Sequence, residues 1–284
     1  MTADAQTLSD GAFARLAAIA HQDAGLALSD AKRQMVQSRL ARHLRRQGFA
    51  NFDDYISHVE GQAGGDERET LISLLTTNVS SFFRESHHFR TLATEVLPGL
   101  ISRAMSGGRV RIWSAGCSTG QEPYSIAMQT LSLAPGIGEK DLRILATDID
   151  RTVLQTGMNA VYSASEADGV PDEMRGKFFK ARNGSAPQVE VTPDARALVT
   201  FRQLNLVKDW PMKGRFDAIF CRNVVIYFDE DVQASLWPRF ANALADGGWF
   251  FLGHSERLNG SSGSMFDNCG ITTFRKRERV VGAA

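Results

Sequence analysis

The spacing of apolar and polar positions indicates a helical region at the start of the chain. Between residues 11 and 60, apolar side chains recur at helical intervals, and we expect one helix to run from Ser29 or Asp30 to Gly48. Serine and aspartate are favoured N-caps, and glycine commonly ends a helix. The apolar stripe of this helix consists of Met35, Val36, Leu40 and Leu44. The sequence therefore predicts an N-terminal all-α domain over residues 1–75.

From Val110 onward the pattern changes, because short apolar runs alternate with helical segments. The runs are 110–114, 142–147, 198–204, 216–221 and 249–253. Such alternation is typical of βαβ units, in which the strands form a mainly parallel sheet. We therefore expect an α/β domain of Rossmann-like type over residues 91–284, joined to the helical domain by a connecting segment at 76–90.

The second and third apolar runs are separated by about fifty residues, which exceeds an ordinary crossover of short loops and one helix. Within this interval, turn signals at Asn183-Gly184 and Thr192-Pro193-Asp194 lie between stretches that favour β structure. Asn-Gly is a strong hairpin signal. We expect a small antiparallel β insertion at about 178–201.

The first apolar run leads into a turn, Ala115-Gly-Cys-Ser-Thr-Gly120, and then into a helix. Glycines let a backbone bend and approach a ligand closely. In an α/β sheet that ligand lies at the carboxyl ends of the strands. A phosphate-binding loop would end in Gly-Lys-Ser or Gly-Lys-Thr, whereas Gln121-Glu122-Pro123 follows here, and the middle glycine of a dinucleotide motif is missing. Pyrophosphate binding is poorly supported.

An adenosine ligand without phosphates, such as S-adenosylmethionine, needs a carboxylate for its ribose hydroxyls at the end of the next strand. Asp148 and Asp150 stand there. We expect Asp150 to cap the following helix and Asp148 to bind the ribose, although both could serve only as caps. Glu122 is placed to face the sulfonium or amino group of such a ligand. The alternative for Glu122 is a favourable charge at a helix N-terminus.

Composition narrows the class of protein. The chain has 284 residues, 43% of them hydrophobic, and its 32 basic residues balance 32 acidic ones, which argues against a general nucleic-acid-binding protein. Cys117, Cys221 and Cys269 lack metal-type spacing and indicate thiols in a reducing compartment. With no apolar run long enough for a bilayer and no basic leader before an apolar core, we expect a cytoplasmic protein without membrane insertion.

Positive charge is concentrated on the expected helix at 32–46. Its basic residues are Lys32, Arg33, Arg39, Arg42, Arg45 and Arg46. This pattern fits equally a solvated face or a docking face for an acidic partner.

Two longer segments resemble a known family. Residues 76–89 (TTNVSSFFRESHHF) and 216–229 (FDAIFCRNVVIYFD) resemble signature segments of the chemotaxis receptor methyltransferases of the CheR type. The resemblance also covers the glycine turn, 146–150, Asn205-Leu206 and 253–256. It implies an S-adenosylmethionine-dependent methyltransferase that forms γ-methyl esters on glutamates in the cytoplasmic helices of methyl-accepting chemotaxis receptors and releases S-adenosylhomocysteine.

The resemblance also implies roles for individual residues. It assigns cofactor contacts to Asn78, Ser80, Arg84, Gly116, Glu122, Asp148, Asn205, Leu206, Cys221 and Arg222. Ser80 replaces a threonine common in the family and keeps the hydroxyl, and Gln121 replaces a frequent acidic residue. Arg84 and Tyr227 are the candidates for orienting the acceptor carboxylate, since a guanidinium and a phenol both donate hydrogen bonds. For Arg84 the alternative is a salt bridge to a neighbouring carboxylate.

Other chemistries find less support. We expect no metal site at His87 and His88, because adjacent residues face different sides of a helix and no third ligand is evident. His254 could suggest a hydrolase triad, but the chain contains no nucleophile elbow of the G-x-S-x-G type. We therefore expect a structural role for His254. Two further alternatives stay open: a related methyltransferase with a different protein acceptor, and a non-catalytic adaptor that binds cofactor. The inserted β subdomain is also a candidate for binding a receptor's C-terminal tether peptide, as in some family members.

Overall fold

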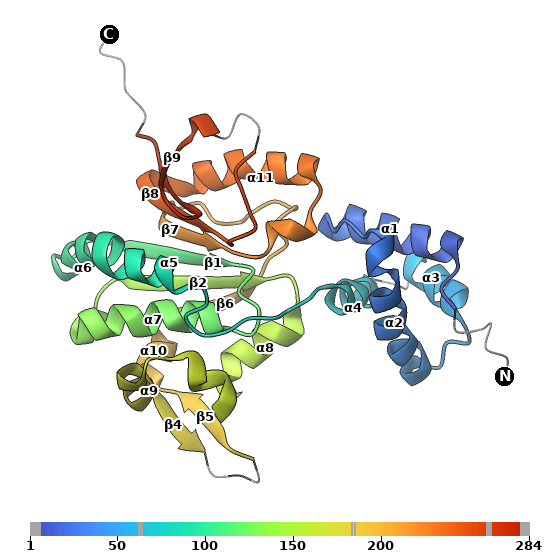
Figure 1. The fold of residues 1–284 in the computed structure, drawn as a ribbon, viewed down its shortest axis with the longest axis horizontal. Helices are drawn as coiled ribbons and strands as arrows, with labels where there is room; N and C mark the ends of the chain where they lie inside the picture. Colours follow the sequence, from blue (N-terminus) through green and yellow to red (C-terminus); the bar gives the residue numbers. More distant parts are fainter. Residues whose placement is uncertain (1–6, 62–64, 183, 185, 260–262, 279–284) are drawn as a thin grey trace. The chain divides into compact units, whose positions relative to one another are not determined.

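The computed structural model describes residues 7–61, 65–182, 184, 186–259 and 263–278 (Figure 1). The chain separates into two compact units: Met1–Thr77 with Tyr227–Val232, and Asn78–Ile226 with Gln233–Ala284. The N-terminal hexapeptide and Asn183 of the expected Asn-Gly turn lie outside the described residues.

In its described residues, the first unit consists mainly of four helices: α1 (Asp10–Ala24), α2 (Arg33–Gln47), α3 (Phe52–Glu60) and α4 (Gly65–Leu75). The predicted end of α2 is confirmed, since Gly48 adopts a left-handed φ of 81° there. Its start differs from the prediction, because Asp30–Lys32 forms a separate 3₁₀ turn and Ser29 makes no side-chain cap. The expected stripe packs inward, with Val36, Leu40 and Leu44 buried and Met35 half-buried.

The second unit contains a seven-stranded sheet of order β6-β2-β1-β7-β8-β10-β9. The strands are β1 (Val110–Ala115), β2 (Leu142–Asp148), β6 (Val199–Gln203), β7 (Phe216–Cys221), β8 (Leu244–Leu252), β9 (Phe266–Gly270) and β10 (Thr273–Lys276). Neighbours among the first five pair in parallel, and β10 runs antiparallel to β8 and β9. The predicted mainly parallel sheet is confirmed. Strand order reverses between β1 and β7, where α/β proteins bind ligands.

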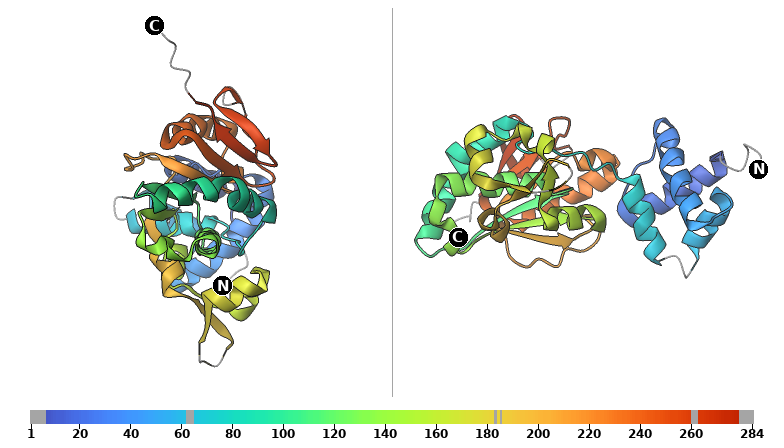
Figure 2. Two further views of the ribbon diagram at one scale, coloured as in Figure 1. Left: turned by 90° about the vertical axis from the view of Figure 1, so that its left-hand side faces the viewer. Right: turned by 90° about the horizontal axis from the view of Figure 1, so that it is seen from below.

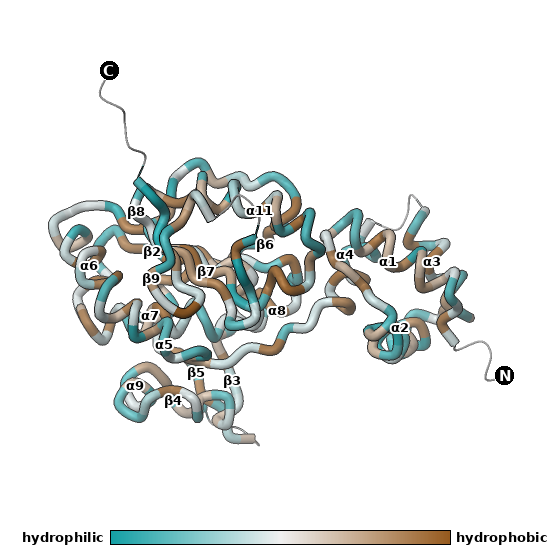
Figure 3. Tube along the Cα trace, turned by 45° about the horizontal axis from the view of Figure 1, so that its top comes forward, coloured by the Kyte–Doolittle hydropathy of each residue, from teal (hydrophilic) through white to brown (hydrophobic). Residues whose placement is uncertain are grey.

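Helices cover the sheet and bury its apolar residues. They are α5 (Ser86–Thr91), α6 (Leu97–Met105), α7 (Gln121–Leu133), α8 (Arg151–Asn159) and α11 (Glu230–Ala243), with a π-helical stretch at Leu92–Val96. Strand β7 is mainly apolar, as Figure 3 shows. Trp113 is fully buried, and its Nε1 donates to Thr147 Oγ1 at 2.8 Å, which ties β1 to β2. Within the described residues, no helix has the length and apolarity needed to cross a bilayer.

A small antiparallel sheet of order β3-β5-β4 forms the predicted insertion. Its elements are β3 (Val161–Ser163), 3₁₀ residues Ala164–Gly169, α9 (Asp172–Phe178), β4 (Phe179–Arg182) and β5 (Gln188–Val191), followed by α10 (Pro193–Ala197). It lies at the end of this unit opposite β9 (Figure 2). The expected bounds of 178–201 need correction: β3 begins earlier, and β6 belongs to the main sheet. The start of the insertion was not predicted because β3 has only three residues, too few to show the two-residue period of a strand.

Gly157 provides a test of how α8 packs on β6. A Cβ there would lie 2.6 Å from Phe201 Cε1, so Gly157→Ala overfills this contact. We expect a loss of about 1–3 kcal/mol in the free energy of unfolding, measured by urea titration. Gly176→Ala in α9 is the matched control, since a Cβ there meets nothing within 4 Å. It should raise stability by about 0.4–1 kcal/mol. Equal effects of the two substitutions would contradict this packing.

Candidate functional site

The glycine turn after β1 shapes the carboxyl edge of the sheet. Gly116 and Gly120 have left-handed φ angles of 78° and 95°. A Cβ on Gly116 would lie 2.3 Å from Val224 Cγ2, and one on Gly120 would lie 3.0 Å from Gly157 Cα. Gly116 N donates to Thr147 O at 2.8 Å, which fixes the turn against the end of β2. Both glycines are therefore required by backbone conformation and by close packing.

Asp148, the last residue of β2, lies inside this turn and is only 8% exposed. Its Oδ2 accepts from Ser118 N at 2.8 Å, and its Oδ1 accepts from Asp150 N at 3.1 Å. Burial raises the pKa of Asp148 to about 6, although these two backbone hydrogen bonds oppose the shift. Asp150 is the N-cap of α8, accepting from Thr152 N at 2.8 Å. The predicted N-cap role of Asp150 is confirmed, and ribose binding by Asp148 stays a prediction.

Two other candidate residues come to the same edge. Asn78 Nδ2 donates to Asp150 Oδ2 at 2.8 Å, and Ser118 Oγ donates to the carbonyl of Asn78 at 3.0 Å. Leu204 N donates to Asp148 O at 2.9 Å, so Asn205 and Leu206 follow next to the end of β2. Sequence reasoning missed Ser118, whose only signal was its place inside the glycine turn.

Glu122 lies in the first turn of α7 and is 9% exposed. Its Oε1 accepts from Ser114 Oγ at 2.7 Å, and its Oε2 accepts from Arg222 Nη1 at 3.0 Å. Burial raises the pKa of Glu122 above its usual range, while Arg222 and Ser114 oppose the shift. The carboxylate of Glu122 is thus oriented by one side chain from β1 and one from the end of β7. These contacts come in addition to any favourable interaction of its charge with the N-terminus of α7.

Arg222 links Glu122 to the segment that precedes α5. Its Nη2 lies 3.2 Å from Glu85 Oε2 and donates to the carbonyl of Arg84. Burial alone would raise the pKa of Glu85, but Arg222 and His254 lower it to about 2. The guanidinium of Arg84 donates to the carbonyl of Val79 at 3.0 Å. Glu85 follows Arg84 in the segment 76–89, and it was not among the candidates predicted from the sequence.

Glu85 lies close to His87 and His88 in the structure, although no third metal ligand was expected there from the sequence. The potential ligand atoms of Glu85, His87 and His88 lie within 4.8 Å of one another. Burial, followed by the charge of Arg222, lowers the pKa of His88 to about 3. The guanidinium of Arg222 already occupies the side of Glu85 Oε2 at 3.2 Å and would repel a second cation. We assign no metal to this cluster.

The remaining candidates lie in different surroundings. Cys221 is buried at the end of β7, and burial raises the pKa of its thiol, which fits an apolar wall better than a nucleophile. Ser80 is half-buried. Tyr227 belongs to the first unit, where its hydroxyl donates to the carbonyl of Thr77 at 3.3 Å and the Lys32 ammonium lies 5.4 Å from its ring centre. The contacts within the second unit therefore do not include Tyr227.

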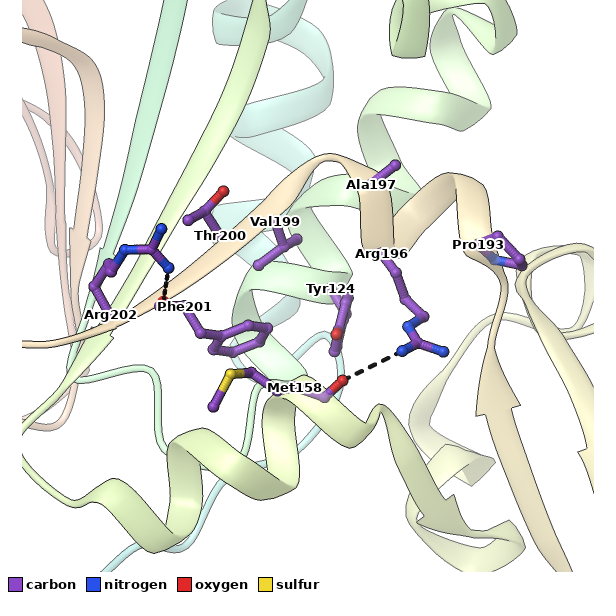
Figure 4. Close-up of a pocket in the computed structure, with 9 residues that line it drawn as sticks. All are labelled: Tyr124, Met158, Pro193, Arg196, Ala197, Val199, Thr200, Phe201 and Arg202. Atoms are coloured by element: carbon purple, nitrogen blue, oxygen red, sulfur yellow. Dashed lines mark hydrogen bonds between the residues drawn. The ribbon is translucent and has the colours of Figure 1, made fainter.

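The hollow drawn in Figure 4 is separate from these residues. It has a volume of about 470 Å³ and lies beside β6, the edge strand of the main sheet. Its lining consists of Tyr124, Met158, Pro193, Arg196, Ala197, Val199, Thr200, Phe201 and Arg202. None of the predicted cofactor contacts lines it.

The buried pairing of Arg222 predicts the effect of removing it. Arg222→Met leaves the buried Glu122 and the half-buried Glu85 without their cation, so we expect a loss of about 3–5 kcal/mol in the free energy of unfolding at pH 7. Glu85 has a pKa of about 2 against an ordinary 4.5, so its pairing stabilises the fold above pH 4.5 and is lost as pH falls towards 2. The difference between wild type and variant should shrink over that range.

The control for this prediction is Arg215→Met. Arg215 pairs with Asp246 at 3.3 Å, with side chains 52% and 42% exposed, so its loss should cost about 0–1 kcal/mol. Denaturant titrations of both variants from pH 7 to pH 3 measure the contrast. A cost at Arg222 no greater than at Arg215 would contradict the pairing.

Comparison with known proteins identifies the family. The family described as CheR methyltransferase, SAM binding domain, matches residues 78–275, and the CheR methyltransferase all-alpha domain matches residues 11–76. A probable chemotaxis protein methyltransferase of Rhizobium etli is 46% identical, over 92% of this chain and 98% of the relative. Chemotaxis protein methyltransferases of Pseudomonas aeruginosa (number 2) and Escherichia coli are 42% and 40% identical, over 82% and 89% of this chain and 82% and 86% of theirs.

Among solved structures, an S-adenosylmethionine-dependent methyltransferase from Mesorhizobium loti aligns at a TM-score of 0.31 with 19% identity, covering 55% of this chain and 51% of its own. That likeness is too weak to carry an argument. The family matches and the relatives span most of the chain, including the glycine turn, Asp148 and Arg222. The chain therefore belongs to the CheR methyltransferase family.

Proposed function

We propose that this protein methylates glutamate side chains in the cytoplasmic helical region of chemoreceptors, using S-adenosylmethionine as methyl donor. The observation that carries the proposal is the pair of oriented, buried carboxylates, Asp148 and Glu122, on the two flanks of one glycine turn. Family membership adds the cofactor class, because the matched domain binds S-adenosylmethionine. The names of the relatives add the chemotaxis context.

The donor and acceptor groups at the turn fit this cofactor. Asp148 Oδ2 accepts from Ser118 N and its Oδ1 accepts from Asp150 N, and an ionised carboxylate has about four lone-pair sites, so acceptor capacity remains for the ribose. Glu122 supplies negative charge for the cationic part of the cofactor. The other proposed contacts are Asn78, Ser80, Arg84, Gly116, Asn205, Leu206, Cys221 and Arg222, all in the same unit.

The proposed reaction does not require the protein to transfer a proton. When bound, the cofactor supplies a methyl group on a positively charged sulfur. The acceptor glutamate is already ionised at neutral pH, since its unperturbed pKa is about 4.3, and no general base is required. The residues of the site then have two tasks, to exclude water and to align the acceptor oxygen with the methyl group. We assign the orientation of the acceptor carboxylate to Arg84 and Tyr227.

The test of the proposed function is the transfer of a labelled methyl group to purified receptor cytoplasmic fragment. We expect label in the receptor that mild base releases as methanol, because carboxylate esters hydrolyse whereas N-methyl groups persist. Base-stable label would favour a methyltransferase with a different acceptor chemistry. Cofactor binding without any transfer in a single turnover would favour the non-catalytic adaptor.

The pKa of Asp148 predicts how cofactor affinity depends on pH. Ribose hydroxyls donate to the ionised carboxylate, so binding must displace the proton that Asp148 carries below about pH 6. We expect the affinity for S-adenosylhomocysteine to be constant from about pH 8 to 7 and to fall by about tenfold per pH unit well below 6, measured by calorimetry. Asp148→Asn should bind about tenfold or more weakly at pH 7.5 and show a smaller dependence of affinity on pH than the wild type. A wild-type affinity that stays flat down to pH 5 would contradict the role of Asp148.

The structure also divides the basic residues of α2 into two groups. Arg39 Nη2 donates to Thr77 Oγ1 at 3.1 Å and its Nη1 to the carbonyl of Leu74 at 3.1 Å, while Arg33 pairs with Asp10 at 3.0 Å and Asp30 at 2.8 Å. These two stabilise the helical unit. The exposed basic residues are Arg42, Arg45 and Arg46. We propose these three as the docking face for acidic receptor helices.

The docking proposal predicts a change in receptor recognition alone. Reversing Arg42, Arg45 and Arg46 to glutamate should raise the KM for receptor by about tenfold or more at low salt, where exposed charges interact most strongly. The kcat at saturating receptor and the affinity for S-adenosylhomocysteine should stay unchanged. Initial rates of methylation at several ionic strengths measure the effect.

The control reverses three exposed cations of the other unit, Arg90, Arg143 and Lys213. It makes the same change in net charge away from α2 and should leave the KM within about threefold of wild type. Equal effects of the two triple variants on the KM would indicate a general effect of net charge and would reject the docking face.

The small sheet β3-β5-β4 stays the candidate for a receptor tether, and titration with receptor tail peptides tests it.

A further inference from the structure

Five backbone N–H groups converge on a single buried side chain, that of Glu256. Its Oε1 accepts from Val224 N and Val225 N at 2.8 Å and from Ile226 N at 3.3 Å. Its Oε2 accepts from Asn223 N at 2.9 Å and Gly253 N at 2.6 Å. Glu256 is only 2% exposed. The carboxylate therefore satisfies the N–H groups of a whole turn that makes no strand pairing of its own.

The turn has a shape that needs such a partner. Asn223 has a left-handed φ of 59°, and the next three N–H groups point to the same side as its own. Consecutive N–H groups arranged in this way form a concave site for an anion, and buried N–H groups without an acceptor are costly. A Cβ on Gly253 would lie 2.7 Å from Asn223 N, so the residue that follows β8 packs closely against the turn. No described side chain other than Glu256 supplies the anion.

The position of the turn in the chain connects it to the reaction. Arg222 immediately precedes the turn and holds Glu122 and Glu85, and Tyr227 immediately follows Ile226. Val224 also packs against Gly116, where a Cβ would come within 2.3 Å of its Cγ2. The geometry of residues 223–226 therefore determines where Arg222 and Val224 meet the glycine turn, and Tyr227 is the next residue along the chain.

We propose that Glu256 is a positioning residue for methyl transfer, which holds the turn 223–226 so that the residues on either side of it are aligned for the reaction. The proposal rests on the roles given above to Arg222 and Tyr227. Glu256 acts through these residues and touches neither cofactor nor acceptor in this account.

Glu256→Gln tests the proposal because glutamine keeps the shape and replaces one acceptor oxygen by an NH₂ donor that faces N–H groups. We expect kcat for receptor methylation to fall by about 10- to 100-fold, since small misplacements of reacting groups cost that much. The affinity for S-adenosylhomocysteine should fall by less than kcat does, because Asp148 is held by the backbone of Ser118 and Asp150, outside the turn 223–226. Glu173→Gln, the same change at an exposed site in α9, should alter neither value.

Two results would overturn the proposal: a kcat within about threefold of wild type, or equal losses of kcat and of cofactor affinity, which would indicate general structural support. Hydrogen exchange on the wild-type protein provides a test that needs no variant. The amides of residues 224–226 should exchange as slowly as those of β7, and exchange at the rate of an open loop would reject the role of Glu256. This measurement does not depend on receptor methylation, so it separates the failure of this proposal from the failure of the proposed function.

Discussion

The buried guanidinium of Arg222 joins parts of the catalytic unit that are distant in the sequence. It pairs with Glu122 at the start of α7 and with Glu85 before α5, and it donates to the carbonyl of Arg84. Each of these charges would be costly to bury alone, and together they compensate one another. The segment before α5, the glycine turn and the end of β7 must therefore be in place together before Glu122 can face a cofactor.

Backbone geometry at the carboxyl edge of the sheet provides the rest of the site. Gly116 allows the turn to pass Val224, Ser118 N holds Asp148, and Glu256 holds the turn that carries Val224. Carboxylates thus serve two purposes here. Glu256 has its hydrogen-bonding capacity occupied by the backbone, whereas Asp148 keeps acceptor capacity for a ligand.

The sequence predicted the fold well where its pattern was long and periodic. The five parallel strands and the end of α2 at Gly48 followed from apolar runs and a glycine stop. It did not locate β3, because three residues show no period, and it gave no sign that Arg39 binds backbone carbonyls within the helical unit. Asp148 could be predicted from its place after a strand, whereas Glu85, Ser118 and Glu256 became evident only through contacts that the fold creates.

The proposed function requires that the glycine turn, with Asp148 and Glu122 on its flanks, binds S-adenosylmethionine for the methylation of a glutamate carboxylate. A crystal structure of the protein with S-adenosylhomocysteine and an acceptor peptide containing a receptor glutamate tests it most directly. We expect both ribose hydroxyls within hydrogen-bond distance of Asp148 and the sulfur end of the product near Glu122. We also expect the acceptor carboxylate to lie in line with the sulfur, oriented by Arg84 and Tyr227. A ribose bound away from Asp148, for example in the hollow beside β6, would contradict it.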